Sequence, residues 1–396
     1  YQADTVTFDN TAGLQTNVTL NSIILPGSMV VNSDSSGNNY NFTGAGGIGG
    51  NASLTKNGSS TLTLGTANTY TGATAINAGT LQLNGSLNGT AITVASGAVL
   101  SESGTGSIGG ATSLAVTGSA TLNGSNSYTG GTSVTSGGSV SINSATSLGA
   151  ASSQLTLDNA TLTTTNAGQL ANGARVINIG AGGATININS TGAAGTGQLY
   201  LATNNTLTGS GALTVTGNGT LGTSGAGNLR IGGTNSFNGP VTLQSGGSLE
   251  LSANSISSSS AITLGNEGEL IVNNAVNLPN NVTVNGGTNS VIGFNGGNTG
   301  NLTGTVTLNA DATVALRDWW NPANVRGGTI SGVISGNGGL AIHSGSGTGG
   351  TLTLSAVNTF TGNITANTSS NLTISGTGQI GSGNYAGNIA MNGGTF

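Results

Sequence analysis

Asn68-Thr69-Tyr70-Thr71-Gly72 is a five-residue segment with an aromatic residue in a turn that ends at glycine. It recurs with small changes as Asn126-Ser127-Tyr128-Thr129-Gly130, Asn235-Ser236-Phe237-Asn238-Gly239 and Asn358-Thr359-Phe360-Thr361-Gly362. The first two aromatic residues are 58 positions apart (128 minus 70), and the later intervals of 109 (237 minus 128) and 123 (360 minus 237) are close to twice that. We interpret Tyr70, Tyr128, Phe237 and Phe360 as the turn aromatics of a degenerate internal repeat.

Short alternating segments surround these turns. Apolar residues alternate with Thr, Ser or Asn, as in Leu62-Thr63-Leu64, Ile92-Thr93-Val94 and Val306-Thr307-Leu308. A period of two, bounded by Gly and Asn, indicates β-strands with one buried face. No stretch of helical length has apolar residues at helical spacing, and glycine lowers helix propensity. We therefore expect almost no helix.

One strand-turn unit cannot bury its apolar face alone, but stacked units place the inward Leu, Val and Ile side chains in a continuous column. Gly and Asn at the corners tolerate the positive φ of tight turns. The sequence therefore predicts an all-β fold, an elongated right-handed parallel β-solenoid. A β-sandwich with a turn every 8–12 residues is the alternative. The in-line repeats favour the solenoid.

A solenoid grows along one axis, so we expect one elongated body with four parts. Residues 1–43 form an N-terminal β segment, 44–310 the solenoid repeats, 311–329 an irregular loop with tryptophans, and 330–396 the C-terminal solenoid coils.

The composition excludes several classes of protein. The 396 residues include 73 glycines, no cysteine and only five basic and ten acidic side chains. A net charge of -5 with a single lysine disfavours binding to nucleic acids or anionic membranes. The absence of cysteine removes disulfides, thiolate catalysis and Cys-based metal sites.

Export is the expected route for this chain. No apolar run approaches the 18 residues of a membrane-spanning helix. The chain begins at Tyr1 without a basic and apolar leader. This start suits a mature secreted or cell-surface protein whose signal peptide was removed, and equally a trimmed chain.

Residues 44 to 83 resemble the autotransporter-associated β-strand repeat, also called the passenger-associated repeat. The resemblance rests on Gly46-Gly47-Ile48-Gly49-Gly50, Ser53-Leu54-Thr55-Lys56-Asn57-Gly58, Asn68-Thr69-Tyr70-Thr71-Gly72 and Ile76-Asn77-Ala78-Gly79-Thr80-Leu81-Gln82-Leu83. Partial copies occupy 113–142, 229–251 and 330–374. The resemblance implies a secreted, surface-exposed bacterial β-solenoid, commonly an adhesin or a structural passenger, and it implies no catalytic residues.

Two candidate sites are a pair of glutamates and the single histidine. Glu267-Gly268-Glu269 would place two carboxylates on one strand face, about 6.6–6.8 Å apart. That spacing fits a weak calcium site or an inverting glycosidase, although surface glutamates need no partner. His343 is the only histidine, and strand alternation places it outside as a solvated side chain.

The strongest compositional outlier is Arg317-Asp318-Trp319-Trp320-Asn321-Pro322, followed by Arg326. Its tryptophans could stack on a sugar ring or anchor a neighbouring subunit. Alternatively, Arg317, Asp318, Trp319, Trp320 and Arg326 belong to a loop that covers the side of the solenoid, with an ion pair between an arginine and Asp318.

Enzymes that act on polysaccharides also use β-helices, but they need several acids or bases on one face. Fifteen charges in 396 residues give roughly one charge per coil, so we predict no enzymatic activity, no catalytic residues and no cofactor.

The strands near both ends of the chain carry no capping helix. We predict that the strands around Val6, Phe8, Ile389 and Met391 pair head to tail and build an extracellular fibre, filament or sheath. A passenger adhesin that binds host or matrix glycans or proteins is the alternative, and a polysaccharide-active enzyme is a weaker one. The expected partners are copies of this chain and, as a further option, surface polysaccharide.

Overall fold

The computed structural model describes residues 4–13, 15–34, 38–165, 170–171, 173–189, 198–218, 227–252, 255–273, 276–286, 289–295, 300–316, 327–344, 349–381 and 383–396. They form two compact units. Unit 1 contains residues 1–164 and 173–184, and unit 2 contains 165–172 and 185–396. The four predicted parts were drawn from sequence composition and stay a prediction.

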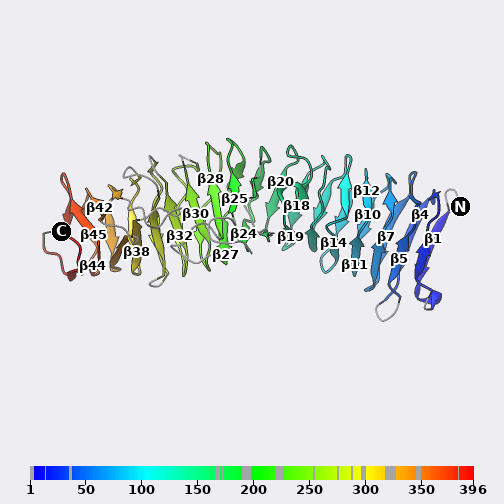
Figure 1. The fold of residues 1–396 in the computed structure, drawn as a ribbon, viewed down its shortest axis with the longest axis horizontal. Coiled ribbons are helices and arrows are strands. Elements are labelled where there is room, and N and C mark those ends of the chain that lie inside the picture. Colours follow the sequence, from blue (N-terminus) through cyan, green and yellow to red (C-terminus); the bar gives the residue numbers. More distant parts are fainter. Residues whose placement is uncertain are drawn as a thin grey trace. The chain divides into compact units, whose positions relative to one another are not determined.

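Unit 1 is a stack of coils in which strands of successive coils pair in parallel (Figure 1). Its first sheet contains β1 (Thr5–Asp9), β4 (Ser28–Asn32), β7 (Ser53–Asn57), β10 (Thr74–Ile76), β13 (Ile92–Val94), β16 (Leu114–Val116), β18 (Thr132–Thr135), β20 (Leu155–Asp158) and β23 (Ile177–Ile179). The second contains β2 (Asn17–Thr19), β5 (Tyr40–Thr43), β8 (Thr61–Leu64), β11 (Thr80–Leu83), β14 (Val99–Glu102), β17 (Ser119–Leu122), β19 (Ser139–Ile142) and β21 (Ala160–Thr164). Shorter ladders join β3 (Ile23–Ile24) to β6 (Gly47–Ile48), and β9 (Ala67–Asn68) through β12 (Ser86–Asn88) to β15 (Ser107–Gly109).

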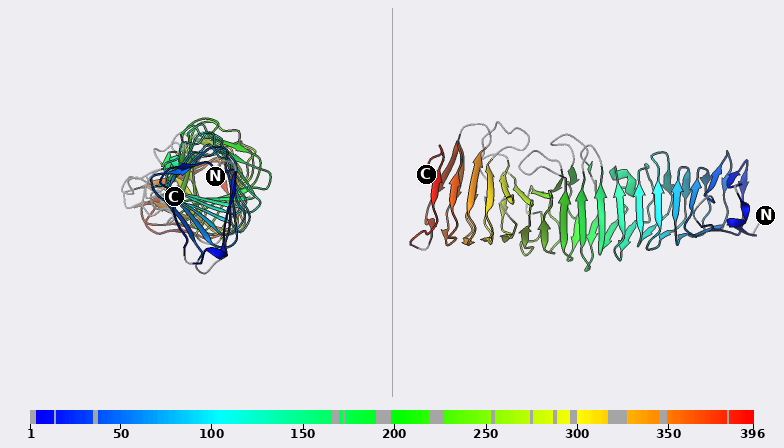
Figure 2. Two further views of the ribbon diagram at one scale, coloured as in Figure 1. Left: turned by 90° about the vertical axis from the view of Figure 1, so that its right-hand side faces the viewer. Right: turned by 90° about the horizontal axis from the view of Figure 1, so that it is seen from below.

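Unit 2 repeats this plan, and Figure 2 shows its strands side by side. One sheet contains β22 (Leu170–Ala171), β25 (Gln198–Leu201), β28 (Asn228–Ile231), β30 (Ser248–Leu251), β32 (Glu269–Val272), β35 (Val291–Phe294), β38 (Ala312–Leu316), β41 (Leu340–Ser344), β44 (Ile364–Ala366) and β47 (Ile389–Met391). A second contains β27 (Leu213–Gly217), β29 (Val241–Leu243), β31 (Ile262–Leu264), β34 (Val282–Val284), β37 (Val306–Leu308) and β40 (Ile334–Gly336). A third contains β33 (Asn277–Leu278), β36 (Asn301–Leu302), β39 (Gly328–Ile330), β42 (Gly350–Leu354) and β45 (Ser370–Ile374), and β43 (Val357–Asn358) pairs with β46 (Gln379–Ile380).

The remaining strands are β24 (Ala184–Ile188) and β26 (Leu207–Gly209). Helical structure in the described residues is confined to two 3-10 turns, η1 (Asn10–Ala12) and η2 (Ala145–Leu148). The prediction of an all-β solenoid of parallel strands with almost no helix is therefore confirmed.

The interior follows from strand alternation. Leu81 on β11 is fully buried and pairs in register with Leu62 on β8 and Leu100 on β14. On either side of Leu81 in the same strand, Thr80 and Gln82 lie on the partly exposed outer face. Burial of each such leucine contributes about 1.5–3 kcal/mol, so columns of this kind supply the main stabilisation of each unit.

The asparagine that begins each aromatic turn links three successive coils, and we call this arrangement the asparagine clamp. Asn68 Oδ1 accepts a hydrogen bond from the Ile48 backbone N–H at 3.1 Å. Its Nδ2 donates to the carbonyls of Thr66 at 2.9 Å and Ser86 at 3.1 Å. The other clamps are Asn126 with Ile108 N–H and the Ser147 carbonyl, Asn235 with Leu207 N–H and the Ser255 carbonyl, and Asn358 with Ile334 N–H and the Gln379 carbonyl.

The glycine that ends each aromatic turn is required because coils approach closely. A Cβ on Gly72 would lie 2.3 Å from the carbonyl oxygen of Ala52, and one on Gly130 would lie 2.5 Å from that of Thr112. Neither glycine has a left-handed φ. Positive φ, the predicted reason for corner glycines, holds at other turns such as Gly79 (φ 65) and Gly97 (φ 80).

Lys56 of the repeat is also a structural residue. Its ammonium is buried and donates hydrogen bonds to the carbonyls of Asn57 at 2.7 Å, Gly58 at 2.8 Å and Ala78 at 3.3 Å. Burial lowers its pKa to about 8. Arg175 is buried in the same way, with its guanidinium bonded to four carbonyls that include those of Leu148 and Gly149. Both cations thus satisfy backbone oxygens at turns.

The four turn aromatics are buried. The residue four positions later is polar where the aromatic residue is tyrosine and apolar where it is phenylalanine. The Tyr70 hydroxyl forms a hydrogen bond with Thr74 Oγ1 at 2.7 Å, and that of Tyr128 with Thr132 Oγ1 at 2.6 Å. Where the aromatic residue is Phe237 or Phe360, the matching residue is the apolar Val241 or Ile364. The hydroxyls therefore occur as pairs or not at all, because a lone buried hydroxyl is costly.

We expect Thr132→Val and Tyr128→Phe each to lower the free energy of unfolding by about 1–2 kcal/mol, because each leaves one buried hydroxyl without a partner. The double variant should lose less than the sum of the two single losses, with a coupling energy of about 1 kcal/mol in urea unfolding. Thr93→Val on the exposed face of β13 is the control and should change stability by less than about 0.5 kcal/mol. Additive losses in the double variant would contradict the pairing.

Candidate functional site

A charged cluster lies on the outer face of unit 2, across three neighbouring strands. Tyr200 on β25 pairs in register with Arg230 on β28, which pairs with Glu250 on β30. The residues that flank Arg230 in the strand, Leu229 and Ile231, point into the core. Strand alternation therefore turns the aromatic ring, the guanidinium and the carboxylate to the same outer face.

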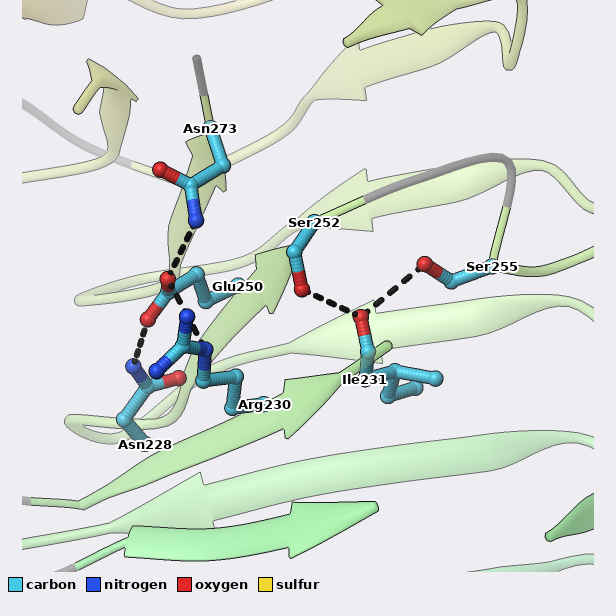
Figure 3. A network of polar contacts seen from close by, with 7 residues as sticks. All are labelled: Asn228, Arg230, Ile231, Glu250, Ser252, Ser255 and Asn273. Atoms are coloured by element: carbon cyan, nitrogen blue, oxygen red, sulfur yellow. Dashed lines mark hydrogen bonds and ion pairs between the residues drawn. The ribbon is translucent and has the colours of Figure 1, made fainter. Parts of the chain in front are cut away.

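Glu250 is the centre of the network in Figure 3. Its Oε1 lies 3.2 Å from Arg230 Nε and accepts a hydrogen bond from Asn273 Nδ2 at 2.8 Å. Its Oε2 accepts from Asn228 Nδ2 at 3.0 Å. The guanidinium carbon of Arg230 lies 4.7 Å from the centre of the Tyr200 ring, a cation–π arrangement.

Two serines close the adjacent turn. Ser252 Oγ donates to the Ile231 carbonyl at 3.1 Å, and Ser255 Oγ donates to the same oxygen at 2.9 Å (Figure 3). Each hydroxyl therefore links its coil to the preceding one.

The two charged groups of the cluster differ in burial. Glu250 is 2% exposed, and burial raises its pKa, against the opposing effects of Arg230 and the Asn228 hydrogen bond. Arg230 keeps 23% of its side chain exposed. Both carboxylate oxygens of Glu250 are thus bound by side chains of this cluster.

Sequence reasoning did not find this cluster. Arg230 and Glu250 are 20 residues apart (250 minus 230), whereas Tyr200 and Arg230 are 30 apart (230 minus 200). Along the chain these charges look isolated, and they meet only across coils. Arg230 and Glu250 meet because they occupy the same position on strands one coil apart. Aligning the strands coil by coil is the signal that could have found the pair.

The predicted glutamate pair is arranged differently from expectation. Glu269 is the first residue of β32 and is buried. Glu267 lies in the preceding turn, is exposed and has a φ of 58. The prediction that both carboxylates lie on one strand face is wrong, because the strand begins only after Gly268 and so contains Glu269 but not Glu267.

His343 lies on β41 and is exposed, as its alternation with Ile342 predicted. Its Nε2 is 2.6 Å from Asn367 Nδ2. In the part of the chain that the structure describes, no group of three or more His, Cys, Asp or Glu side chains could hold a metal ion. The described residues also contain no helix long and apolar enough to cross a membrane.

The predicted contact residues Arg317, Asp318, Trp319, Trp320 and Arg326 lie outside the described residues. Their three readings, a covering loop, a protein interface and a glycan contact, stay predictions.

The predicted assembly strands are present as strands. Val6 and Phe8 lie on β1, which pairs with β4, and both side chains are partly buried. Ile389 and Met391 lie on β47, which pairs with β44, and Ile389 is 41% exposed.

The family model described as passenger-associated-transport-repeat matches three segments of the chain, residues 54–83, 117–142 and 224–251. These segments overlap the first three predicted copies, so the predicted resemblance is confirmed. The fourth copy, which contains Asn358 and Phe360, lies beyond the matched segments but keeps the clamp and the buried ring.

No curated protein matches the chain. Among solved structures, the chain is similar to a crystal structure described as a TibC-catalysed hyper-glycosylated fragment of TibA, with 13% identity, complete coverage of both chains and a TM-score of 0.22. A TM-score this low supports no conclusion about fold or function.

Replacing Arg230 by methionine should lower the free energy of unfolding by about 2 kcal/mol, because the buried Glu250 loses its cation. Adding Glu250→Gln to Arg230→Met should recover part of this loss, because the amide is uncharged. Chemical unfolding of unit 2 measures both effects. Glu267→Gln, at an exposed turn, is the control, and an equal loss in that variant would show that the Arg230 effect is not specific.

Proposed function

Because the chain carries passenger-associated-transport repeats, we propose that it is the surface-exposed solenoid of an exported passenger protein, with a structural and non-enzymatic role. The repeat family supports exposure at the cell surface or secretion. The fold supports a scaffold, because stacked coils give a surface whose size grows with each repeat.

The observation that carries the structural role is the position of the charged side chains. Lys56 and Arg175 bind backbone carbonyls, and Glu102 and Glu250 bind amides of neighbouring coils. A chain with so few charges uses these four to join coils. These contacts do not bring acids and bases together on one face, as hydrolysis or lyase chemistry would require.

The absence of natural cysteines allows a direct test of exposure. In cells that make the protein, Ser96→Cys should react with a membrane-impermeant maleimide, because Ser96 lies in an exposed turn. Val94→Cys, two residues earlier in the core, should react only after denaturation. Labelling of Ser96→Cys only in broken cells would rule out a surface location.

We propose as a second function that copies of the chain join through the edges of β1 and β47. The supporting observation is Ile389, a large apolar side chain that is 41% exposed on a strand paired with β44 alone among the described strands. A sheet edge of this kind favours pairing with a further strand. In the adhesin alternative, the solenoid remains a monomer and contacts another ligand.

Sedimentation of the 396-residue chain over a wide range of concentrations tests assembly. We expect large species for wild type and loss of most of them for Ile389→Lys, because a charge on an edge strand opposes pairing. Val357→Lys, on a different exposed strand, is the control. A chain that stays monomeric at every concentration would exclude the fibre and leave the adhesin.

A further inference from the structure

The asparagine clamp at Asn126 differs from the other three. At Asn68, Asn235 and Asn358, both side-chain N–H groups donate to backbone carbonyls. At Asn126, one donates to the Ser147 carbonyl at 2.8 Å, and the other donates to Glu102 Oε2 at 3.0 Å. Glu102 belongs to the preceding coil, so an ionisable side chain forms part of this clamp.

A glycine makes room for the carboxyl group. Two residues before Asn68 stands Thr66, and two residues before Asn126 stands Gly124. A Cβ on Gly124 would lie 2.6 Å from Glu102 Oε1 and 2.2 Å from the Gly106 carbonyl oxygen. The backbone N–H of Gly124 also donates to Glu102 Oε2 at 3.2 Å. The carboxyl group therefore fills the volume that a side chain at position 124 would need.

Among the described residues, no basic side chain forms an ion pair with Glu102. It is 1% exposed, and Oε1 has no hydrogen-bond partner among the described residues. Its neighbours in register are Leu83 on β11 and Leu122 on β17. Burial raises the pKa of the Tyr128 hydroxyl to about 12, Arg175 lowers it and Glu102 raises it, so both charged groups act on this hydroxyl. The guanidinium of Arg175 is bound to the carbonyls of Ala145, Leu148, Gly149 and Ser153.

We infer that Glu102 is stored as a neutral carboxylic acid and makes the Asn126 clamp a proton-linked joint between coils of unit 1. With a proton, the carboxyl group still accepts through Oε2, and Oε1 becomes a donor on the side of Gly124 where the Gly106 carbonyl lies. Without it, a negative charge is enclosed next to leucines with no cation to balance it.

Burial has the largest effect on the pKa of Glu102 and raises it, whereas the hydrogen bonds from Asn126 and Gly124 act in the opposite direction. A carboxyl whose pKa is higher in the folded than in the unfolded chain binds more protons when folded. Its contribution is complete below the ordinary glutamate pKa and is lost as pH rises through the raised value. Unit 1 should therefore hold together best in mild acid.

Direct titration tests the protonation state. The chain contains only four glutamates, Glu102, Glu250, Glu267 and Glu269, so labelling with glutamate enriched in ¹³C at the carboxyl carbon gives few signals. The signal that disappears in Glu102→Gln should titrate above the ordinary glutamate pKa of about 4.3. A signal that titrates at that ordinary pKa or below it would overturn the inference.

A stability measurement tests the joint itself. On going from about pH 5 to about pH 8, the midpoint of thermal unfolding should fall further for wild type than for Glu102→Gln, because the amide cannot ionise. Glu267→Gln should keep the wild-type difference. Hydrogen exchange read on peptides from unit 1 that contain Ile108 and Gly124 should accelerate with pH beyond the intrinsic rate in wild type alone. Equal pH dependence in wild type and Glu102→Gln would refute a proton-linked joint.

Discussion

The distance between neighbouring coils is the constraint on which the rest of the structure depends. Parallel strands pair at about 4.8 Å, and turns that follow the same path must approach equally closely. At Gly72 and Gly130, this approach leaves no room for a Cβ. The asparagine clamps satisfy the polar groups that such close turns would otherwise bury unpaired, by joining each coil to the coils before and after it.

The same constraint explains why so few charges are used and where they lie. A charged side chain between coils must find partners on backbone or amide groups, as Lys56 does with three carbonyls. Glu250 instead binds one arginine and two asparagines on the outer face. Charges that bind groups of neighbouring coils contribute to the cohesion of the stack.

The repeat signature therefore supplies contacts between neighbouring coils. Its asparagine, aromatic residue and glycine all face the neighbouring coils. Coils without the signature remain possible because alternating strands pair without it, as β31 and β34 do. The repeat is therefore irregular along the chain: some coils contain an asparagine clamp, and the others are held by strand pairing and columns of apolar side chains.

The sequence by itself determined the class of fold, because alternation, Gly-rich turns and a recurring aromatic motif are local properties. It also located the clamp residues, although not their partners. Only the tertiary structure decided which side chains meet, since coils differ in length: the register partners Tyr200 and Arg230 are 30 residues apart (230 minus 200), and the register partners Arg230 and Glu250 are 20 apart (250 minus 230). Without a constant period, contacts such as Arg230 with Glu250 or Glu102 with Asn126 cannot be read from spacing. They depend on the register of stacked strands and on the room that residues such as Gly124 leave.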